Sequence, residues 1–134
     1  MIALDTSVVV AAFATWHEGH ASAIAALSDG PRLPAHVLVE TYAVLTRLPP
    51  PHRAPADVVE AFLGEHFTAA LLTLPGPAQR EMLRLAVRRG LGGGAIYDAL
   101  VAATAKHAGA TLLTRDRRAT PVYEAVGVRF EVLS

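Results

Sequence analysis

Four acidic residues of this sequence stand in surroundings that are unusual for a charge. Asp5 ends the apolar segment MIAL, Glu40 lies within VLVETYAVL, Asp98 lies within AIYDALVAA, and Asp116 comes just after TLLT. An unpaired charge is costly to bury, so each of these carboxylates needs a metal ion, a protein partner, a proton or water. The other eight acidic residues lie in polar or helix-surface settings: Glu18, Asp29, Asp57, Glu60, Glu65, Glu81, Glu124 and Glu131.

Four carboxylates in one site indicate divalent-cation chemistry. Carboxylate oxygens are hard ligands that suit magnesium or manganese better than zinc. Two ionised carboxylates about 5 Å apart, at an effective dielectric constant of about 20, repel each other by roughly 3 kcal/mol. A bound divalent cation removes this repulsion, polarises a phosphoryl oxygen and activates water. The pattern therefore predicts phosphate or phosphodiester chemistry.

Each acid also has a purely structural interpretation. Asp5 and Asp116 are placed to cap the helices that follow them, which is as common a role as catalysis. Glu40 lies at a spacing that permits a stretched ion pair with Arg47, and Asp98 requires a partner from elsewhere in the chain. The neighbouring hydroxyls have the same two interpretations, as ligands that orient a carboxylate or phosphate and as turn or cap residues; they belong to Thr6, Ser7 and Thr114.

The elements that must position these acids alternate between strand and helix. We expect strands at 1–4, 32–35, 69–74, 111–114 and 128–133. We expect helices at 7–14, 17–30, 36–48, 55–67, 77–90, 92–110 and 115–127. This alternation predicts a parallel sheet wrapped by helices. Functional groups of such sheets gather beyond the carboxyl ends of the strands, where Asp5 and Asp116 fall.

Composition narrows the function classes further. The 134 residues suit one domain, spanning 1–134, and the net charge of zero gives no global basic field. The chain has no cysteine, which excludes disulfides and thiolate metal sites. No secretory signal or membrane span is recognisable, so we expect a cytoplasmic protein with no membrane partner. GLGGGA, at 90–95, follows an arginine-rich helix and not a strand, which favours a hinge over a dinucleotide site.

Three segments, taken in order, resemble a known family. They are LDTSVVV, VETYAVLTRLP and YDALVAATAKHAGATLLTRDRRA. Together they resemble the PIN-domain ribonucleases, and among these the VapC-type toxins of toxin–antitoxin pairs, over nearly the whole chain from Ile2 to Leu133. The resemblance implies an α/β fold, a PIN-like three-layer sandwich with about five parallel strands in the order 3-2-1-4-5 between helices. It also implies a metal-dependent endoribonuclease that forms a homodimer and binds a cognate antitoxin.

The resemblance assigns roles to individual residues. Asp5, Glu40, Asp98 and Asp116 match the catalytic acids, and Thr114 matches the hydroxyl that precedes the last acid by two residues. We expect Asp5, Asp98 and Asp116 to bind Mg²⁺ or Mn²⁺, with Glu40 as a ligand, a water-mediated ligand or a general base. Some relatives carry a further acid where Arg117, Arg118 and Ala119 stand here, so a second metal position stays open. The candidates for contact with the RNA backbone are Arg115, Arg117 and Arg118, with Arg84, Arg88 and Arg89 as further candidates.

Two other functions remain open at this point. One is a PIN nuclease outside a toxin pair, acting in RNA processing or on structured DNA. The other is a catalytically silent module that keeps the fold for binding a partner. The complete set of four acids disfavours the silent module, because nothing else in such a protein would require these carboxylates together.

Overall fold

A short parallel sheet lies at the centre of the computed structural model, which describes residues 1–134. Its strands are β1 (Ile2–Leu4), β2 (Thr111–Thr114) and β3 (Phe130–Val132), in the order β1-β2-β3. Ala3 pairs with Leu112, and Leu113 pairs with Glu131. Ala3, Leu4 and Leu112 are fully buried, as expected for strands covered on both faces.

The sheet has three strands, so the expectation of about five is wrong. Two further segments join it beyond β1 through isolated parallel bridges, from Ala3 to Arg32 and from Pro34 to Leu72. The order of the segments across the sheet is therefore 72, 32–34, β1, β2 and β3, as the expected strand order requires. Proline has no N–H to donate to a strand ladder, and Pro31 precedes the second segment while Pro34 is its last residue. Pro34 therefore cannot donate the next hydrogen bond to β1, and α3 begins at Ala35, which ends the pairing with residue 72.

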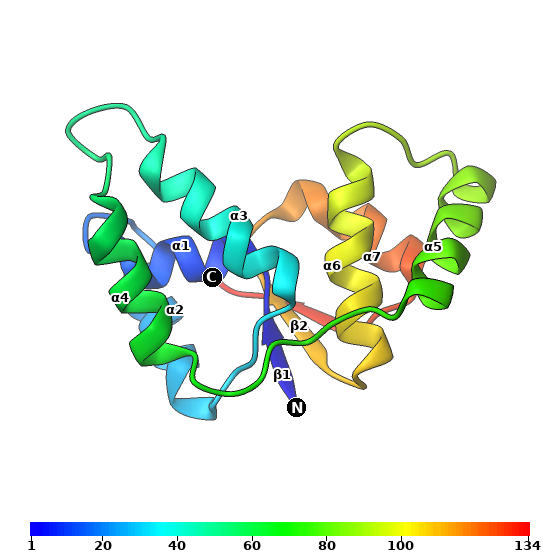
Figure 1. The fold of residues 1–134 in the computed structure, drawn as a ribbon, viewed down its shortest axis with the longest axis horizontal. Helices are drawn as coiled ribbons and strands as arrows, with labels where there is room; N and C mark the ends of the chain where they lie inside the picture. Colours follow the sequence, from blue (N-terminus) through cyan, green and yellow to red (C-terminus); the bar gives the residue numbers. More distant parts are fainter.

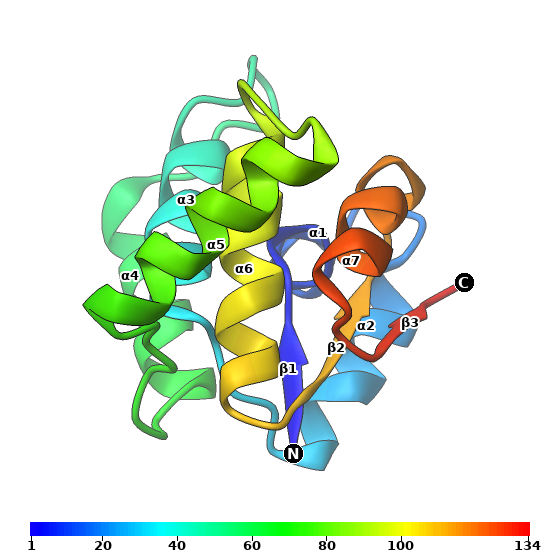
Figure 2. The ribbon, with the colours of Figure 1, turned by 90° about the vertical axis from the view of Figure 1, so that its right-hand side faces the viewer.

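Helices cover the sheet on both sides. Their bounds are α1 (Thr6–Phe13), α2 (His20–Ala26), α3 (Ala35–Thr46), α4 (Ala56–His66), α5 (Gly76–Arg89), α6 (Ala95–His107) and α7 (Thr120–Val126), with 3-10 turns η1 (Leu27–Asp29) and η2 (Arg117–Ala119). Figure 1 shows α1 to α4 as one lobe and α5 to α7 as the other, with the strands between them. In Figure 2, α3, α5 and α6 lie on one side of β1, and α2 and α7 lie on the other. This is the layered arrangement that the resemblance predicts.

The expected helices are present, with shifted ends. Residues 15–19 form turns and bends, so α2 begins at His20 and not at position 17. Gly90 ends α5 with a φ of 68°, a left-handed conformation that glycine adopts without strain. None of the helices combines the length and the apolar character that a membrane span requires.

Candidate active site

The four singled-out acids differ from the others in burial. All eight remaining acidic residues are exposed, whereas Asp5 is buried and Glu40, Asp98 and Asp116 are half-buried. The four line one cavity of about 50 Å³ together with Thr6, Ser7, Val101 and Tyr123. The structure therefore brings together the acids that sequence context had separated from the rest.

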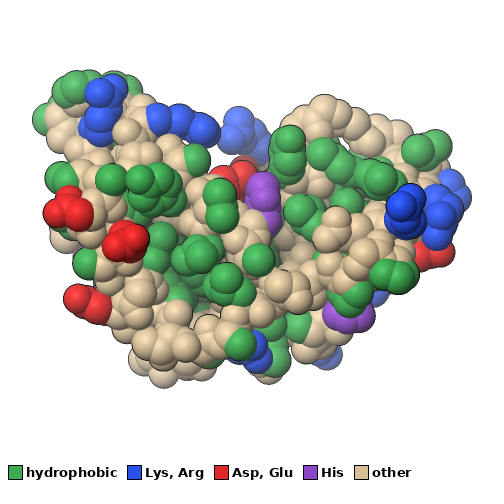
Figure 3. Space-filling view, in the orientation of Figure 1, with side chains coloured by type: hydrophobic (Ala, Val, Ile, Leu, Met, Phe, Trp, Pro, Cys, Tyr) green, Lys and Arg blue, Asp and Glu red, His purple; other side chains and the backbone are tan.

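Two adjacent strand ends and two helices supply these acids. Asp5 follows β1, and Asp116 lies two residues beyond β2, which pairs with β1. Glu40 lies near the middle of α3, and Asp98 lies in the first turn of α6. Figure 3 shows acidic side chains and a histidine in the notch between the two lobes. The carboxyl ends of the strands thus face the opening of the cavity, as in other open α/β sheets.

Asp5 is held by donors on both of its oxygens. Its Oδ1 accepts hydrogen bonds from the Ser7 hydroxyl and the Val8 N–H, and its Oδ2 accepts one from the Tyr123 hydroxyl at 2.8 Å. Burial raises the pKa of Asp5 above its ordinary value, and these hydrogen bonds act in the opposite direction. Asp5 also caps α1, so the capping and cavity interpretations both hold.

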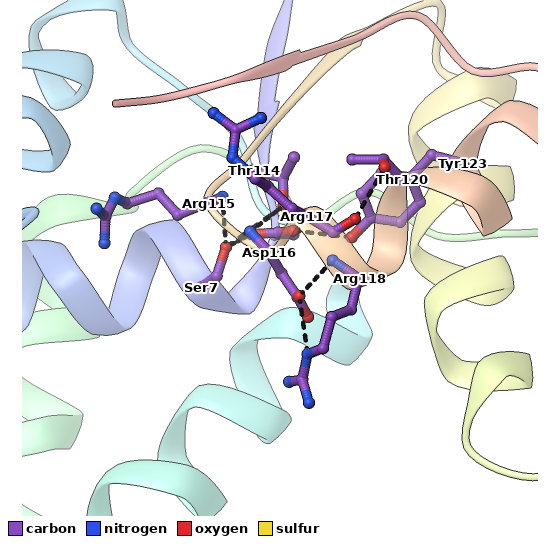
Figure 4. Close-up of polar contacts among 9 residues, drawn as sticks. Ser7, Thr114, Arg115, Asp116, Arg117, Arg118, Thr120 and Tyr123 are labelled. Atoms are coloured by element: carbon purple, nitrogen blue, oxygen red, sulfur yellow. Dashed lines mark hydrogen bonds and ion pairs between the residues drawn. The ribbon is translucent and has the colours of Figure 1, made fainter.

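Hydroxyl groups connect the two strand ends. Ser7 Oγ, which donates to Asp5, accepts the Arg115 N–H at 2.8 Å and lies 3.5 Å from Thr114 Oγ1. Thr114 Oγ1 in turn accepts the Asp116 N–H at 3.0 Å, as Figure 4 shows. Ser7 and Thr114 therefore fix the backbone that carries Asp116 relative to Asp5.

Glu40 has two partners, and neither is the arginine that its spacing had indicated. Its Oε1 accepts a hydrogen bond from the Thr6 hydroxyl, and its Oε2 lies 3.5 Å from Nε2 of His36, one turn earlier in α3. No ion pair forms between Glu40 and Arg47, which is exposed. Thr6 thus positions the Glu40 carboxylate toward the cavity.

Asp98 has no partner at all. It accepts no hydrogen bond and forms no ion pair, although the other three acids are each held by donors. Burial raises the pKa of Asp98, and the nearby carboxylates of Asp116, Glu40 and Asp5 raise it further, against a weaker opposing effect from Arg118. The cationic partner that a structural interpretation of Asp98 requires is therefore missing. The carboxylate oxygens of Asp98 can therefore bind a ligand without first losing a protein partner.

The three arginines that follow β2 point in different directions. The N–H and the Nε of Arg118 both donate to Asp116 Oδ1, at 3.0 and 3.4 Å, and Arg117 is exposed. In Figure 4 the Arg115 side chain points away from Asp116. Its Nη1 lies 3.4 Å from His17 Nδ1, and a Cβ at Gly19 would lie 2.2 Å from Arg115 Cζ. Only Arg118 among the three candidates stands beside the acids.

Three residues near the cavity were missed at the sequence level. Tyr123 had no distinguishing signal, because it lies in the buried face of α7 with Val122 and Val126. His36 carried a usable signal, since it precedes Glu40 by four residues on the same helix face. Tyr97 stacks on His36 and was also not among the predicted site residues.

The donor chemistry of the cavity suits magnesium or manganese, although no three acidic or histidine side chains are close enough together to hold an ion by themselves. The side-chain atoms of the cavity that could bind a metal are all oxygens, which these ions prefer. Mg²⁺ usually keeps several waters and binds one or two carboxylates plus substrate phosphate, so a full protein ligand set is not required. Asp98 has unpartnered oxygens among like charges, and a cation would relieve this repulsion.

The chain matches known proteins over its whole length. Residues 2–125 match the model of the PIN domain family. The chain is 52% identical to ribonuclease VapC40 of Mycobacterium tuberculosis over 134 residues, all of both proteins. It is 41% identical to ribonuclease VapC27 of the same organism over 133 residues, which cover 98% of this chain and 96% of that protein.

A solved structure shows the same fold. The crystal structure of M. tuberculosis VapC20, a toxin that cleaves the sarcin-ricin loop, superposes with a TM-score of 0.73. The match covers 96% of each chain at 20% identity. At this identity the likeness extends to the arrangement of helices and strands and carries no information about the substrate.

Proposed function

Because the chain belongs to the PIN-domain family, in the group of the VapC ribonucleases, we propose that it is a metal-dependent endoribonuclease acting at the cavity of Asp5, Glu40, Asp98 and Asp116. One observation carries this proposal. Four carboxylates from two strand ends and two helices converge on one cavity, and Asp98 among them lacks any protein partner. A protein gains nothing structurally from such an arrangement, because the like charges repel one another.

The residues of the cavity have different roles in the proposed hydrolysis of a phosphodiester bond. Asp5, Asp98 and Asp116 are the candidate ligands of Mg²⁺ or Mn²⁺, of which one or two would bind the ion directly and the rest through water. The bound ion would polarise a phosphoryl oxygen and lower the pKa of water. Ser7, Val8 and Tyr123 keep the Asp5 carboxylate in one orientation. Glu40, positioned by Thr6, would accept the proton of the attacking water or would hold the metal directly or through water.

The small size of the cavity favours a substrate that lies outside it. A volume of about 50 Å³ holds little more than one or two waters, each of which occupies about 30 Å³ in the liquid. We infer that the RNA strand crosses the opening and presents one phosphate to the acids. Arg118, at the side of Asp116, is the arginine best placed to neutralise that phosphate, and Arg117 is exposed nearby.

A separate apolar groove suits a protein partner. It has a volume of about 510 Å³ and lies between α3 and α4, lined mainly by Leu38, Val39, Tyr42, Leu63 and Phe67. The groove is lined mainly by apolar side chains, and the apolar face of an amphipathic helix fits such a groove. We assign this groove to the antitoxin that the family resemblance implies. A small upstream reading frame with a DNA-binding half would support a toxin pair over a nuclease of RNA processing.

Cleavage of RNA by the purified protein tests the enzymatic proposal. Structured and unstructured RNA are incubated with Mg²⁺ or Mn²⁺ and then with EDTA. We expect cleavage with the metals and none with EDTA, and loss of cleavage when Asp5 and Asp98 are both replaced by alanine. Asp57→Asn, an exposed acid of α4, is the matched control and should cleave normally. Cleavage that survives EDTA, or the double alanine variant, would exclude the metal mechanism.

A further inference from the structure

Two aromatic rings stack at the rim of the acidic cavity. The rings of His36 and Tyr97 lie parallel, with an interplanar angle of 1° and centroids 5.3 Å apart. His36 belongs to the first turn of α3, and Tyr97 to the first turn of α6. The stack therefore joins the beginnings of the two helices that supply Glu40 and Asp98.

The inner ring of this stack lies beside one of the four acids, Glu40. His36 Nε2 lies 3.5 Å from Glu40 Oε2, and this nitrogen is buried without a hydrogen-bond partner. The His36 side chain is 26% exposed, whereas Tyr97 is 55% exposed. Tyr97 is thus the outer, more exposed ring of the stack.

Stacking on His36 reduces the rotamer freedom that Tyr97 would lose on binding a ligand. A free tyrosine on a helix surface samples several rotamers and loses that freedom when a ligand fixes it. Stacking on the more buried His36 holds the ring in one orientation before any ligand arrives. An exposed, oriented aromatic face is the feature that proteins use to bind bases of single-stranded nucleic acid.

We propose that Tyr97, supported by His36, is a stacking subsite for a nucleobase of the RNA strand next to the phosphate at the acids. The adjacent position of that phosphate rests on the proposed function. The small cavity requires the strand to lie across the rim, and the stack occupies the rim on the side of Glu40. Every base has a π-face, so this subsite would accept all four bases and contribute affinity more than sequence preference.

Binding can be measured separately from cleavage. The probe is a fluorescein-labelled, mixed-sequence single-stranded RNA of about twelve nucleotides, within the site sizes known for such proteins. Anisotropy is recorded in EDTA for the wild type and for Tyr97→Phe, Tyr97→Leu and Tyr97→Ala. We expect wild-type affinity for the phenylalanine variant. The leucine and alanine variants should bind about 5- to 100-fold more weakly, as for the loss of one base–aromatic stack.

Tyr97→Leu separates stacking from mere covering of His36. Leucine keeps an apolar cover over the histidine ring but offers no π-face, so wild-type binding by this variant would overturn the proposal. A series of probes with one abasic position each provides a second test. One abasic position should weaken wild-type binding and have no further effect on Tyr97→Ala. An abasic penalty that is equal in both proteins would also overturn the subsite.

The remaining outcomes distinguish this subsite from the ribonuclease proposal. Probe binding that depends on Tyr97, in a protein that cleaves no RNA with metal, would overturn the ribonuclease proposal alone. Metal-dependent cleavage without a Tyr97 effect on binding, or without measurable probe binding, would overturn the subsite alone. Light scattering of Tyr97→Ala is the control for a protein interface. A change in its oligomeric state would assign Tyr97 to that interface and overturn the subsite.

Discussion

The Tyr123 hydroxyl donates a hydrogen bond of 2.8 Å to Asp5 Oδ2, joining α7 to the end of β1 inside the cavity wall. Tyr123 is almost fully buried, and Asp5 is only 4% exposed. Burial, followed by the charge of Asp5, raises the pKa of Tyr123 far above its ordinary value, so the hydroxyl stays protonated and remains a donor. Tyr123 therefore orients Asp5, although none of the sequence segments that indicated the site contains Tyr123.

Replacing Tyr123 by phenylalanine removes this donor and leaves the ring in place. We expect the free energy of unfolding to fall by about 1–3 kcal/mol, the usual cost of leaving a buried acceptor unsatisfied. The loss should be larger at about pH 8 than at about pH 5, because the ionised carboxylate needs the donor more than the protonated one. Metal-dependent cleavage should fall by about 10- to 100-fold, as for other residues that orient metal ligands.

Urea unfolding at both pH values and cleavage assays measure these effects. Tyr42→Phe is the matched control, because Tyr42 is exposed and its hydroxyl makes no hydrogen bond. A Tyr123→Phe protein with the stability and cleavage of the control would show that the hydrogen bond has no role.

Replacing Asp98 by asparagine tests the unpartnered carboxylate. Burial and three acidic neighbours raise the Asp98 pKa above its ordinary value of 3.8, so the folded protein binds this proton more tightly than the unfolded chain. The resulting stability is present below the unfolded pKa and is lost as the pH rises through the folded pKa. Asp98→Asn should thus match or exceed the metal-free wild type near pH 7, by about 1 kcal/mol at most. The difference should shrink near pH 4.

Denaturation in EDTA at several pH values measures this difference, and the cleavage assay should find the variant inactive. A hidden cationic partner would reverse the result, because its unpaired charge would cost about 3–5 kcal/mol. A strongly destabilised Asp98→Asn protein would therefore contradict our account of this residue.

Metal binding should be visible without any substrate. A ligand that binds only the folded state stabilises it by about 2.7 kcal/mol at a hundredfold excess over its Kd. Mn²⁺ or Mg²⁺ should therefore raise the Tm of the wild type, and the increase should be smaller in Asp98→Asn. The Tm is measured by thermal melts with EDTA, Mg²⁺ and Mn²⁺ for both proteins. Equal Tm shifts in the two would place the metal away from Asp98.

The sequence predicted which acids meet because their local contexts conflicted with their charge. An acid within an apolar helix segment, as with Asp98, has few structural explanations. An acid at a strand end, as with Asp5, can also cap the next helix, and the structure places both acids in one cavity. The roles of these residues in catalysis remain predictions. The expected helices were also largely correct, because apolar periodicity and end signals such as Gly90 act locally.

Contacts between distant residues could not be predicted from the sequence. Tyr123 reaches Asp5 across 118 positions, and a tyrosine on an apolar helix face gives no sign of its partner. The two missing strands have a different cause. Apolar segments indicated strands at 32–35 and 69–74, but Pro34 has no N–H with which to continue the pairing with β1. The pairing with residue 72 ends because α3 begins at Ala35.

The exposed apolar face of α5 should mediate a homodimer. Val87 is 82% exposed and Leu83 is 53% exposed, and they are four residues apart on one helix face. We expect the wild type to be a dimer and Val87→Glu to be a monomer, because a buried unpaired carboxylate opposes association. Val58→Glu, at an exposed apolar position of α4, is the matched control and should remain dimeric. Light scattering over a concentration series measures the mass, and a wild type that stays monomeric would contradict the dimer.

All four acids belong to one chain, so monomeric Val87→Glu should still cleave RNA. Loss of cleavage in a folded monomer would show that the partner chain contributes to the site.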